Sequence, residues 1–245
     1  MGGDITRFVT RYLRAASGAT VALSVGLLSY NGRQRVKGIA AAVGHREFHG
    51  RLPKMHLKSL LHDDEGTKVF VVSRARWNVS LMELVLICRL ARRACPEAVF
   101  EFGTFNGRTT LHLAANLPKA RLVTLDLPRE RGGDFFGYDP GGRFRGTPEA
   151  ARITQIWGDS LTMDFSPLHG QFDFIFIDAG HAYENVINDS LKALPLLRGG
   201  KGMIVWHDYE SIQGVTPALD HLYLTDARFG GLRHIAGTSL AILRL

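Results

Sequence analysis

The chain has 245 residues, of which 45% are hydrophobic, which is enough to bury the core of one large domain and excludes disorder of the whole chain. The net charge of +7 is uneven, because residues 1–60 hold ten Lys or Arg against two acidic residues, whereas residues 61–245 sum to −1. No apolar run reaches the ~18 residues of a membrane span, and arginines interrupt the N-terminal pattern that a secretory signal requires, so we expect a cytoplasmic protein.

The N-terminal region predicts a basic appendage. Residues 5–14 place apolar side chains at helical spacing, with three arginines largely opposite. Such a helix can lie on an anionic membrane, which predicts peripheral membrane contact through residues 1–15, or it can pack in a homodimer. A solvated basic face without a partner is a third interpretation. Residues 30–66 have no clear period, and we assign residues 1–69 to a helical and linker appendage.

From residue 70 onward, helical patterns alternate with apolar runs of strand length. The first helical pattern starts at Ser80, which forms the sequence pattern of a capping box with Glu83. The apolar runs are AVFEFG (98–103), RLVTLD (121–126), ITQIWGD (153–159), FDFIFID (172–178) and GMIVWHD (202–208). Strands that are apolar on both faces and separated by helices predict a mostly parallel sheet covered on both sides.

The last residues complete this predicted sheet. Residues 231–245 read as two strands joined by a Gly-Thr turn. We therefore predict an α/β domain over residues 70–245, with a Rossmann-like, doubly wound, mostly parallel sheet of seven strands whose last strand is antiparallel.

Polar residues end each predicted parallel strand, at the edge where open sheets bind ligands. The first strand continues into EFGTFNGRTT, in which Gly103 and Gly107 allow a sharp turn and a close approach to a helix N-terminus. The second strand ends at Asp126, an acid suited to accept hydrogen bonds from ribose hydroxyls. The spacing G-x-x-x-G and the carboxylate of Glu101 fit a cofactor with a cationic centre and an ammonium better than a pyrophosphate.

These motifs resemble those of the class I S-adenosylmethionine (SAM)-dependent methyltransferases over roughly residues 75–245. EFGTFNGRTT is similar to the glycine turn of the metal-dependent O-methyltransferases that act on catechols and of related enzymes that methylate macrolide sugars. Residues 172–209 are similar to the latter group throughout. The resemblance implies SAM as cofactor and methyl transfer to a hydroxyl of a small molecule or sugar.

The resemblance also implies which residues bind this cofactor. Glu101 and Gly103 would lie by its methionine part, Asp126 by its ribose, and Asp159 and Ser160 by its adenine. The full set of implied cofactor-binding residues is Glu101, Gly103, Thr104, Gly107, Thr109, Asp126, Asp159 and Ser160.

A divalent cation is implied at the ends of the fourth and fifth strands, held by Asp178, His207 and Asp208. Mg²⁺ or Mn²⁺ there would lower the pKa of a substrate hydroxyl, and His181 would be the general base, acting with Asp178 in catalysis. His207 departs from the carboxylate or amide usual at its place, which shifts the preference toward Mn²⁺, Fe²⁺ or Zn²⁺. Alternatively, His181 only starts a helix, and His207 bonds to a backbone carbonyl.

Two other functions stay open. The chain could be a partner-binding or membrane-attached module of the same fold without catalysis, or an enzyme resembling the antibiotic-tailoring hydroxylases, with the metal used for oxygen chemistry. The acids and His181 favour the methyltransferase. No nucleic-acid motif occurs, and the acceptor is not identified, although residues 127–150 predict either a lid over the site or a disordered excursion.

Overall fold

The structure is a computed structural model that describes residues 49–60, 66–70, 77–128, 139–212 and 214–245. The chain divides into two compact units, Met1–Glu47 and Phe48–Leu245, and only the second contains described residues. The predicted amphipathic helix over residues 5–14 therefore lies outside the described residues, as does the central part of the predicted lid, residues 129–138.

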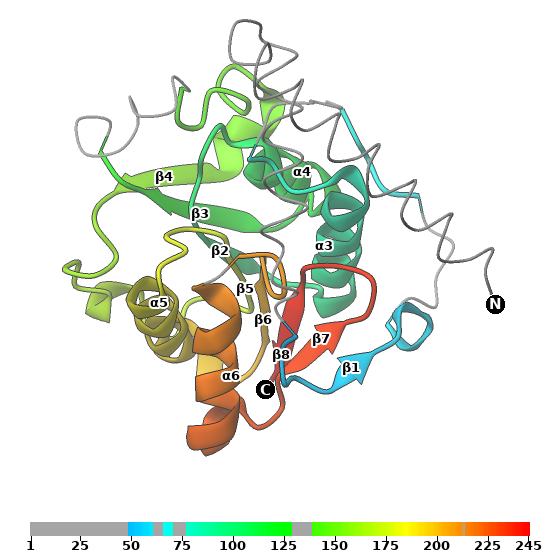
Figure 1. The fold of residues 1–245 in the computed structure, drawn as a ribbon. Coiled ribbons are helices and arrows are strands. Elements are labelled where there is room, and N and C mark those ends of the chain that lie inside the picture. Colours follow the sequence, from blue (N-terminus) through cyan, green and yellow to red (C-terminus); the bar gives the residue numbers. More distant parts are fainter. Residues whose placement is uncertain (1–48, 61–65, 71–76, 129–138, 213) are drawn as a thin grey trace, which may run out of the picture. The chain divides into compact units, whose positions relative to one another are not determined.

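Within the described residues, eight strands form one sheet (Figure 1). Its order is β1-β7-β8-β6-β5-β2-β3-β4, with β8 antiparallel to β6 and β7 and the other pairs parallel. The bounds are β1 (Lys54–Met55), β2 (Ala98–Phe102), β3 (Arg121–Asp126), β4 (Ile153–Trp157), β5 (Phe174–Ile177), β6 (Met203–Trp206), β7 (Arg233–Ile235) and β8 (Ala241–Arg244). The predicted sheet with its antiparallel last strand is confirmed, and β1 adds an eighth strand.

Helices cover both faces of the sheet. The α-helices are α3 (Leu81–Ala94), α4 (Arg108–Asn116), α5 (Tyr183–Leu196) and α6 (Val215–Thr225), and the short 3-10 helices are η2 (Leu57–Ser59), η5 (Pro148–Arg152), η6 (Ser166–Leu168), η7 (Arg198–Gly200) and η8 (Ala227–Phe229). Helices α3 and α4 share one hydrophobic core with one face of the sheet, while α5 and α6 share a second core with the other face (Figure 1). This is the doubly wound arrangement.

The two cores follow from the alternation of side chains along each strand. In β2, Phe100 and Phe102 enter the core with α5 and α6, whereas Val99 enters the core with α3 and α4. All three side chains are fully buried. Truncation of such a phenylalanine to alanine costs about 3–5 kcal/mol. This packing fixes the positions of the strands. It thereby also fixes where the residues that directly follow their carboxyl ends lie.

The predicted capping box is present at the start of α3. Ser80 Oγ accepts a hydrogen bond from the backbone N–H of Glu83 at 3.2 Å, and Glu83 Oε2 accepts one from the backbone N–H of Ser80 at 3.3 Å. These contacts satisfy donors that a helix N-terminus otherwise leaves open. They also bring Glu83 to the end of β6, where the candidate site lies.

Residues 49–60 belong to the described unit, although their pattern predicts a linker. The backbone N–H of Leu52 donates to Tyr209 Oη at 3.0 Å, and Tyr209 Oη donates to Asp220 Oδ1 at 2.6 Å. Leu52 and Leu60 are buried. Pairing of β1 with β7 completes the attachment. Because this strand is only two residues long, it has no alternation of apolar and polar residues by which the sequence could predict it.

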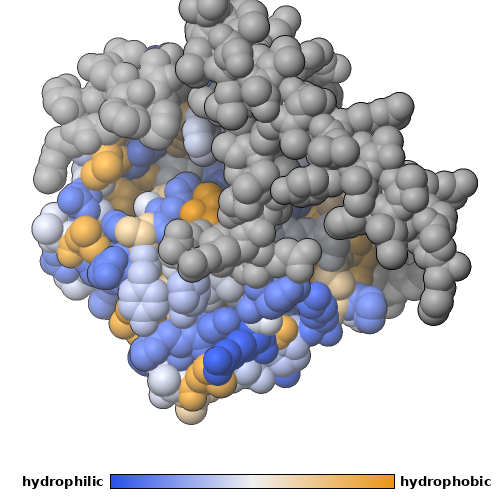
Figure 2. Space-filling view, viewed as in Figure 1, coloured by the Kyte–Doolittle hydropathy of each residue, from blue (hydrophilic) through white to orange (hydrophobic). Residues whose placement is uncertain are grey.

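The described surface on the face in Figure 2 is mainly hydrophilic over α5 and α6, and its hydrophobic residues form small separate patches. No helix among the described residues is both long and apolar enough to cross a bilayer.

Candidate active site

A cavity of about 380 Å³ opens beyond the carboxyl ends of β2, β3, β4 and β5. Its wall contains most of the residues implied by the sequence, namely Gly103, Thr104, Thr109, Asp126, Asp159, Ser160, Asp178 and His181. The sequence reasoning missed other lining residues, among them Trp77, Asn78, Asn106, Arg108 and Asn185. Trp77 and Asn78 could have been found, because they directly precede the predicted helix that begins at this edge of the sheet.

The glycine turn after β2 is required by close contacts. Gly103 has φ +92°, and a Cβ added there would lie 2.1 Å from the backbone oxygen of Asp178. Gly107, the N-cap of α4, has φ +80°, and its Cβ would lie 2.6 Å from the ring of Phe144. Glycine therefore lets the end of β2 approach the end of β5 and lets α4 begin beside the cavity. Gly107 shapes the turn from outside the described cavity wall.

Asp126 ends β3 with its carboxylate in the cavity wall. Its Oδ2 accepts a hydrogen bond from the backbone N–H of Phe105 at 2.7 Å, and its Oδ1 accepts one from that of Leu127 at 2.8 Å. Burial raises the pKa of this carboxyl, and the backbone hydrogen bonds partly oppose the rise. Each oxygen keeps a further lone pair, so the carboxylate is held in place and can still accept from a ligand.

Glu101 lies behind the turn and is only 2% exposed. Its Oε2 accepts hydrogen bonds from the hydroxyls of Thr110 and Thr124, and its Oε1 has no hydrogen-bond partner in the described part of the chain. Burial raises the pKa of Glu101 to about 8, although the two hydroxyls lower it. Glu101 is outside the described cavity wall, and its contact with the cofactor stays a prediction.

The loop after β4 carries Asp159 and Ser160 into the cavity wall. Asp159 Oδ1 accepts a hydrogen bond from the backbone N–H of Leu161 at 3.0 Å. Two side chains of α5 hold the loop. Asn188 Nδ2 and Lys192 Nζ donate hydrogen bonds to the backbone oxygen of Ser160 at 3.0 and 2.5 Å. The loop therefore has a defined position against which a ligand can bind.

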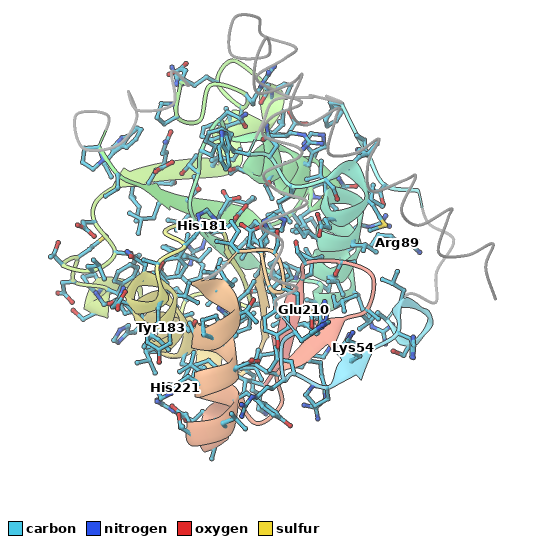
Figure 3. All side chains as sticks on the ribbon, viewed as in Figure 1. Lys54, Arg89, His181, Tyr183, Glu210 and His221 are labelled. Carbon is cyan, nitrogen blue, oxygen red and sulfur yellow. The ribbon has the colours of Figure 1, made fainter. Side chains whose placement is uncertain are left out.

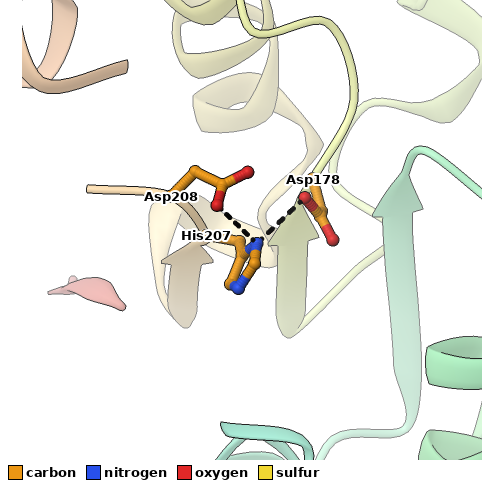
Figure 4. A group of neighbouring side chains, drawn as sticks. All are labelled: Asp178, His207 and Asp208. Atoms are coloured by element: carbon orange, nitrogen blue, oxygen red, sulfur yellow. Dashed lines mark ion pairs between the residues drawn. The ribbon is translucent and has the colours of Figure 1, made fainter. Parts of the chain in front are cut away.

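Asp178, His207 and Asp208 meet where β5 and β6 end (Figure 4). His207 Nδ1 lies 3.3 Å from both Asp178 Oδ1 and Asp208 Oδ1. Its Nε2 lies 3.5 Å from Oε2 of Glu83, a residue that the sequence identifies only as a helix cap. The side chain of His207 therefore faces three carboxylates, and the alternative of a backbone carbonyl partner is not what these contacts show.

His181 joins this cluster from the cavity side. Its Nε2 lies 2.9 Å from Asp208 Oδ2 and 3.7 Å from Asp178 Oδ1, and its side chain is 43% exposed. Helix α5 begins at Tyr183, with Ala182 as N-cap and no side-chain capping bond, so His181 does not cap this helix. Tyr183 and His221 lie together on α5 and α6, whereas His181 lies at the edge of the sheet (Figure 3).

The charges of the cluster are strongly coupled. Burial disfavours the charged form of His207, but the nearby carboxylates of Asp178, Asp208 and Glu83 raise its pKa to about 12. Hydrogen bonds to Asp178 and Asp208 raise the pKa of His181 to about 9. Burial works against ionisation of both aspartates, yet the two histidines hold their pKa values below the usual range. Both imidazoles are therefore protonated at neutral pH when no cation is bound.

The donor set fits a divalent cation. One atom each from Asp178, His207 and Asp208 lies within 4.8 Å of the others. Ligand atoms about 2.1 Å from an octahedral ion and at right angles are about 3.0 Å apart, which is near the 3.3 Å from His207 Nδ1 to each carboxylate. His207 Nδ1 is buried and has no hydrogen-bond partner among the described residues.

The strand order and the cavity beyond β2 are those of a doubly wound sheet with a ligand site at the carboxyl ends of its strands. Residues 100–209 match the family model described as Methyltransferase domain. The match spans somewhat less than half of the chain and includes the glycine turn, Asp126 and the Asp178, His207 and Asp208 cluster. This similarity agrees with the predicted methyltransferase family. Comparison with curated proteins found no match.

Solved structures share this fold at low identity. The O-methyltransferase TomG from Streptomyces achromogenes, involved in tomaymycin synthesis and solved with SAM, is 23% identical, with a TM-score of 0.51 over 69% of this chain and 82% of that chain. The Podospora anserina methyltransferase PaMTH1, bound to S-adenosylhomocysteine (SAH), is 19% identical, with a TM-score of 0.53 over 69% and 80%. An O-methyltransferase from Bacillus cereus with SAH is 19% identical, with a TM-score of 0.50 over 70% and 84%. The predicted fold class is confirmed.

Proposed function

We propose that the chain is a SAM-dependent O-methyltransferase that acts on a hydroxyl of a small molecule or sugar, with a divalent cation held by Asp178, His207 and Asp208. One observation carries the proposal. Asp126, whose carboxylate suits a ribose, lines the same cavity as Asp178 and His181. His181 Nε2 lies 3.7 Å from Asp178 Oδ1. The likeness to an O-methyltransferase solved with SAM supports this function.

The chain would hold the cofactor with the glycine turn, Asp126 and the loop of Asp159. Bound at these sites, SAM would supply an electrophilic methyl group, and the cation would compensate the two aspartates and lower the pKa of the acceptor hydroxyl. Most of the contribution of the protein is then orientation of the two reactants in the cavity.

His181 would remove the proton of the acceptor hydroxyl. Its imidazole is accessible from the cavity, and the contact of 2.9 Å with Asp208 orients it. The pKa of about 9 arises from Asp178 and Asp208. A cation that neutralises these carboxylates would therefore return the pKa of His181 toward the ordinary value of about 6.5. At neutral pH the imidazole would then be neutral and could accept a proton. This exposed base beside Asp208 favours catalysis over a binding module without catalysis.

The remaining expectations extend this proposal. We propose a cytoplasmic location, no nucleic-acid partner, and either a homodimer or peripheral membrane contact through residues 1–15. The division into an appendage at residues 1–69 and a catalytic domain at residues 70–245 also stays a prediction.

Calorimetry on the full chain tests cofactor binding directly. Titration with SAM and with SAH should show saturable binding of one molecule per chain, because both share the nucleoside and amino-acid parts that the cavity wall would contact. ATP is a suitable control, since it has the same nucleoside but carries phosphates instead of the sulfonium and ammonium. Absence of binding for both SAM and SAH would remove the proposed function.

A further inference from the structure

Glu83 reaches the proposed metal site from a different element than the three proposed ligands. It is the third residue of α3, it is only 7% exposed, and its Oε2 lies 3.5 Å from His207 Nε2. The opposite ring nitrogen of His207 faces Asp178 and Asp208 at 3.3 Å each. The imidazole is therefore placed between one carboxylate on its Nε2 side and two on its Nδ1 side.

The carboxylate of Glu83 is fixed on both oxygens. Oε1 accepts hydrogen bonds from the backbone N–H and the hydroxyl of Ser239, each at 2.7 Å, and Oε2 accepts one from the hydroxyl of Ser80 at 2.7 Å. Glu83 is thus a held acceptor and cannot turn away from the imidazole without losing these bonds.

The two nitrogens of an imidazole divide their roles according to what each one faces. An acceptor on one side keeps the proton there, and the other nitrogen then offers its lone pair. A carboxylate behind a ligating histidine fixes the ring and increases its basicity. Because Glu83 faces Nε2, the lone pair that a bound cation would use belongs to Nδ1, the buried atom that has no hydrogen-bond partner in the described chain.

We infer that Glu83 is a positioning residue that presents His207 Nδ1 as a metal ligand, so that the site selects transition ions such as Mn²⁺ or Co²⁺ over Mg²⁺. This inference rests on the proposed function, because it concerns the cation of that site. A nitrogen ligand favours these ions, whereas Mg²⁺ prefers a shell of oxygen atoms. The preference for transition ions over Mg²⁺ therefore depends on Glu83 of α3 and on His207, which directly follows β6.

Metal titrations of the full-length protein test this assignment without an acceptor substrate. Mn²⁺, Co²⁺ and Mg²⁺ are titrated separately into the metal-free protein by calorimetry, and the visible absorption spectrum of the Co²⁺ form reports its ligand field. The wild-type protein should bind Mn²⁺ and Co²⁺ at least about ten-fold more tightly than Mg²⁺. Equal affinity for Mg²⁺ and the two transition ions would overturn the inference.

Three variants separate positioning from stability. Glu83→Gln should weaken Mn²⁺ and Co²⁺ binding about 10- to 100-fold and shift the Co²⁺ spectrum, with a smaller effect on Mg²⁺. His207→Asn, which exchanges nitrogen for an amide oxygen, should reduce the preference for Co²⁺ over Mg²⁺. Ala91→Gly is the control, since it weakens α3 by about 1 kcal/mol at a core position two turns from Glu83, and it should keep the wild-type metal preference.

The outcomes also separate this inference from the proposed function. If Glu83→Gln and Ala91→Gly change metal binding equally, Glu83 acts only through the stability of α3, and the inference fails while the proposed function stands. If the wild-type protein binds SAM but none of the three ions, His207 itself neutralises the carboxylates. The inference then fails together with metal assistance, and SAM-dependent transfer remains. If the wild-type protein binds neither SAM nor SAH, the proposed function is wrong, whatever the metal titrations show.

Discussion

The carboxylate of Asp126 is held by two backbone N–H groups and still faces the cavity. Asp126→Ala removes charge-assisted hydrogen bonds to a bound ribose, so we expect SAM binding to weaken by roughly 1–3 kcal/mol. Calorimetry with SAM measures this loss. Asp164→Ala is a suitable control, because Asp164 is an exposed aspartate bonded to Ser166 and lies outside the described cavity wall. Unchanged SAM affinity in Asp126→Ala would contradict the assigned role.

His181 is the residue whose substitution should change the rate and leave the fold intact. His181→Ala should lower kcat by about 10²- to 10⁴-fold, the usual contribution of a positioned base. Activity should partly recover at higher pH, where the acceptor hydroxyl ionises without help. SAH release with a competent acceptor measures the rate, and calorimetry should show nearly unchanged SAM and metal binding.

A histidine outside the cavity provides the control for this substitution. His221 is exposed on α6, where its ring lies 6.1 Å from that of Tyr183 (Figure 3). His221→Ala should keep the wild-type rate and pH profile. If His181→Ala lowers only the melting temperature and keeps the rate per folded molecule, His181 has a structural role and the proposed base is wrong.

Glu101 should make the stability of the fold depend on pH. Its pKa rises from the ordinary value of 4.5 to about 8, with burial as the main cause. Between these values the unfolded chain loses the proton while the folded chain keeps it, so the stability from this group is present below about pH 4.5 and is lost as pH rises to about 8. The glutamine of Glu101→Gln cannot titrate. The melting temperature of this variant, relative to that of the wild type, should therefore rise by several degrees as the pH increases from 5 to 8.5.

Thermal melts of both proteins in the same buffers measure this difference. Other groups titrate alike in both chains and cancel in the comparison. A difference in melting temperature that is constant with pH would show that Glu101 is already ionised at pH 5 in the folded protein. It would then be available as a charged partner for the cofactor ammonium, as the sequence predicts.

At the scale of single elements, the glycine turn after β2 depends on both backbone conformation and space. Gly103→Ala meets a positive φ of +92° and a clash with Asp178, whereas Gly237→Ala meets a φ of +83° with no atom within 4 Å. Gly237→Ala should therefore cost only about 1–2 kcal/mol of unfolding free energy. Gly103→Ala should cost more and also weaken SAM binding, because the ends of β2 and β5 must separate.

Denaturant unfolding of the two glycine variants isolates the clash. The backbone penalty is common to both variants, so the difference between them reports the close approach of β2 and β5. Equal losses of stability with unchanged SAM affinity would mean that the turn tolerates a side chain. The turn would then not control the shape of the cavity.

For the whole molecule, the uneven charge predicts a separate role for the N-terminal segment. Deletion of residues 1–15 should either abolish sedimentation with anionic vesicles or reduce the mass measured by light scattering. We expect the second result, because enzymes commonly bury an amphipathic face between subunits. If the full-length protein neither sediments with vesicles nor exceeds the monomer mass, both predicted roles are wrong.

Local patterns were sufficient to predict the sheet and the acidic residues of the cavity wall. Apolar runs reveal strands, and the residue after each run must lie at the carboxyl edge whatever else packs around it. Asp126, Asp159 and Asp178 were therefore found at that edge, and the capping box of Glu83 was equally local, since its partners are three residues apart. These inferences needed only spacing along the chain.

Only the tertiary structure decided which of these groups touch. Glu83 belongs to α3 and His207 follows β6, and their contact depends on how α3 packs on the sheet, which no local period encodes. Packing likewise places Glu101 between β2, β3 and α4, behind the cavity wall rather than in it. Strand β1 is two residues long and is stabilised by its partner β7. Contacts between residues far apart in sequence depend on the packed core as a whole, and for that reason spacing could not predict them.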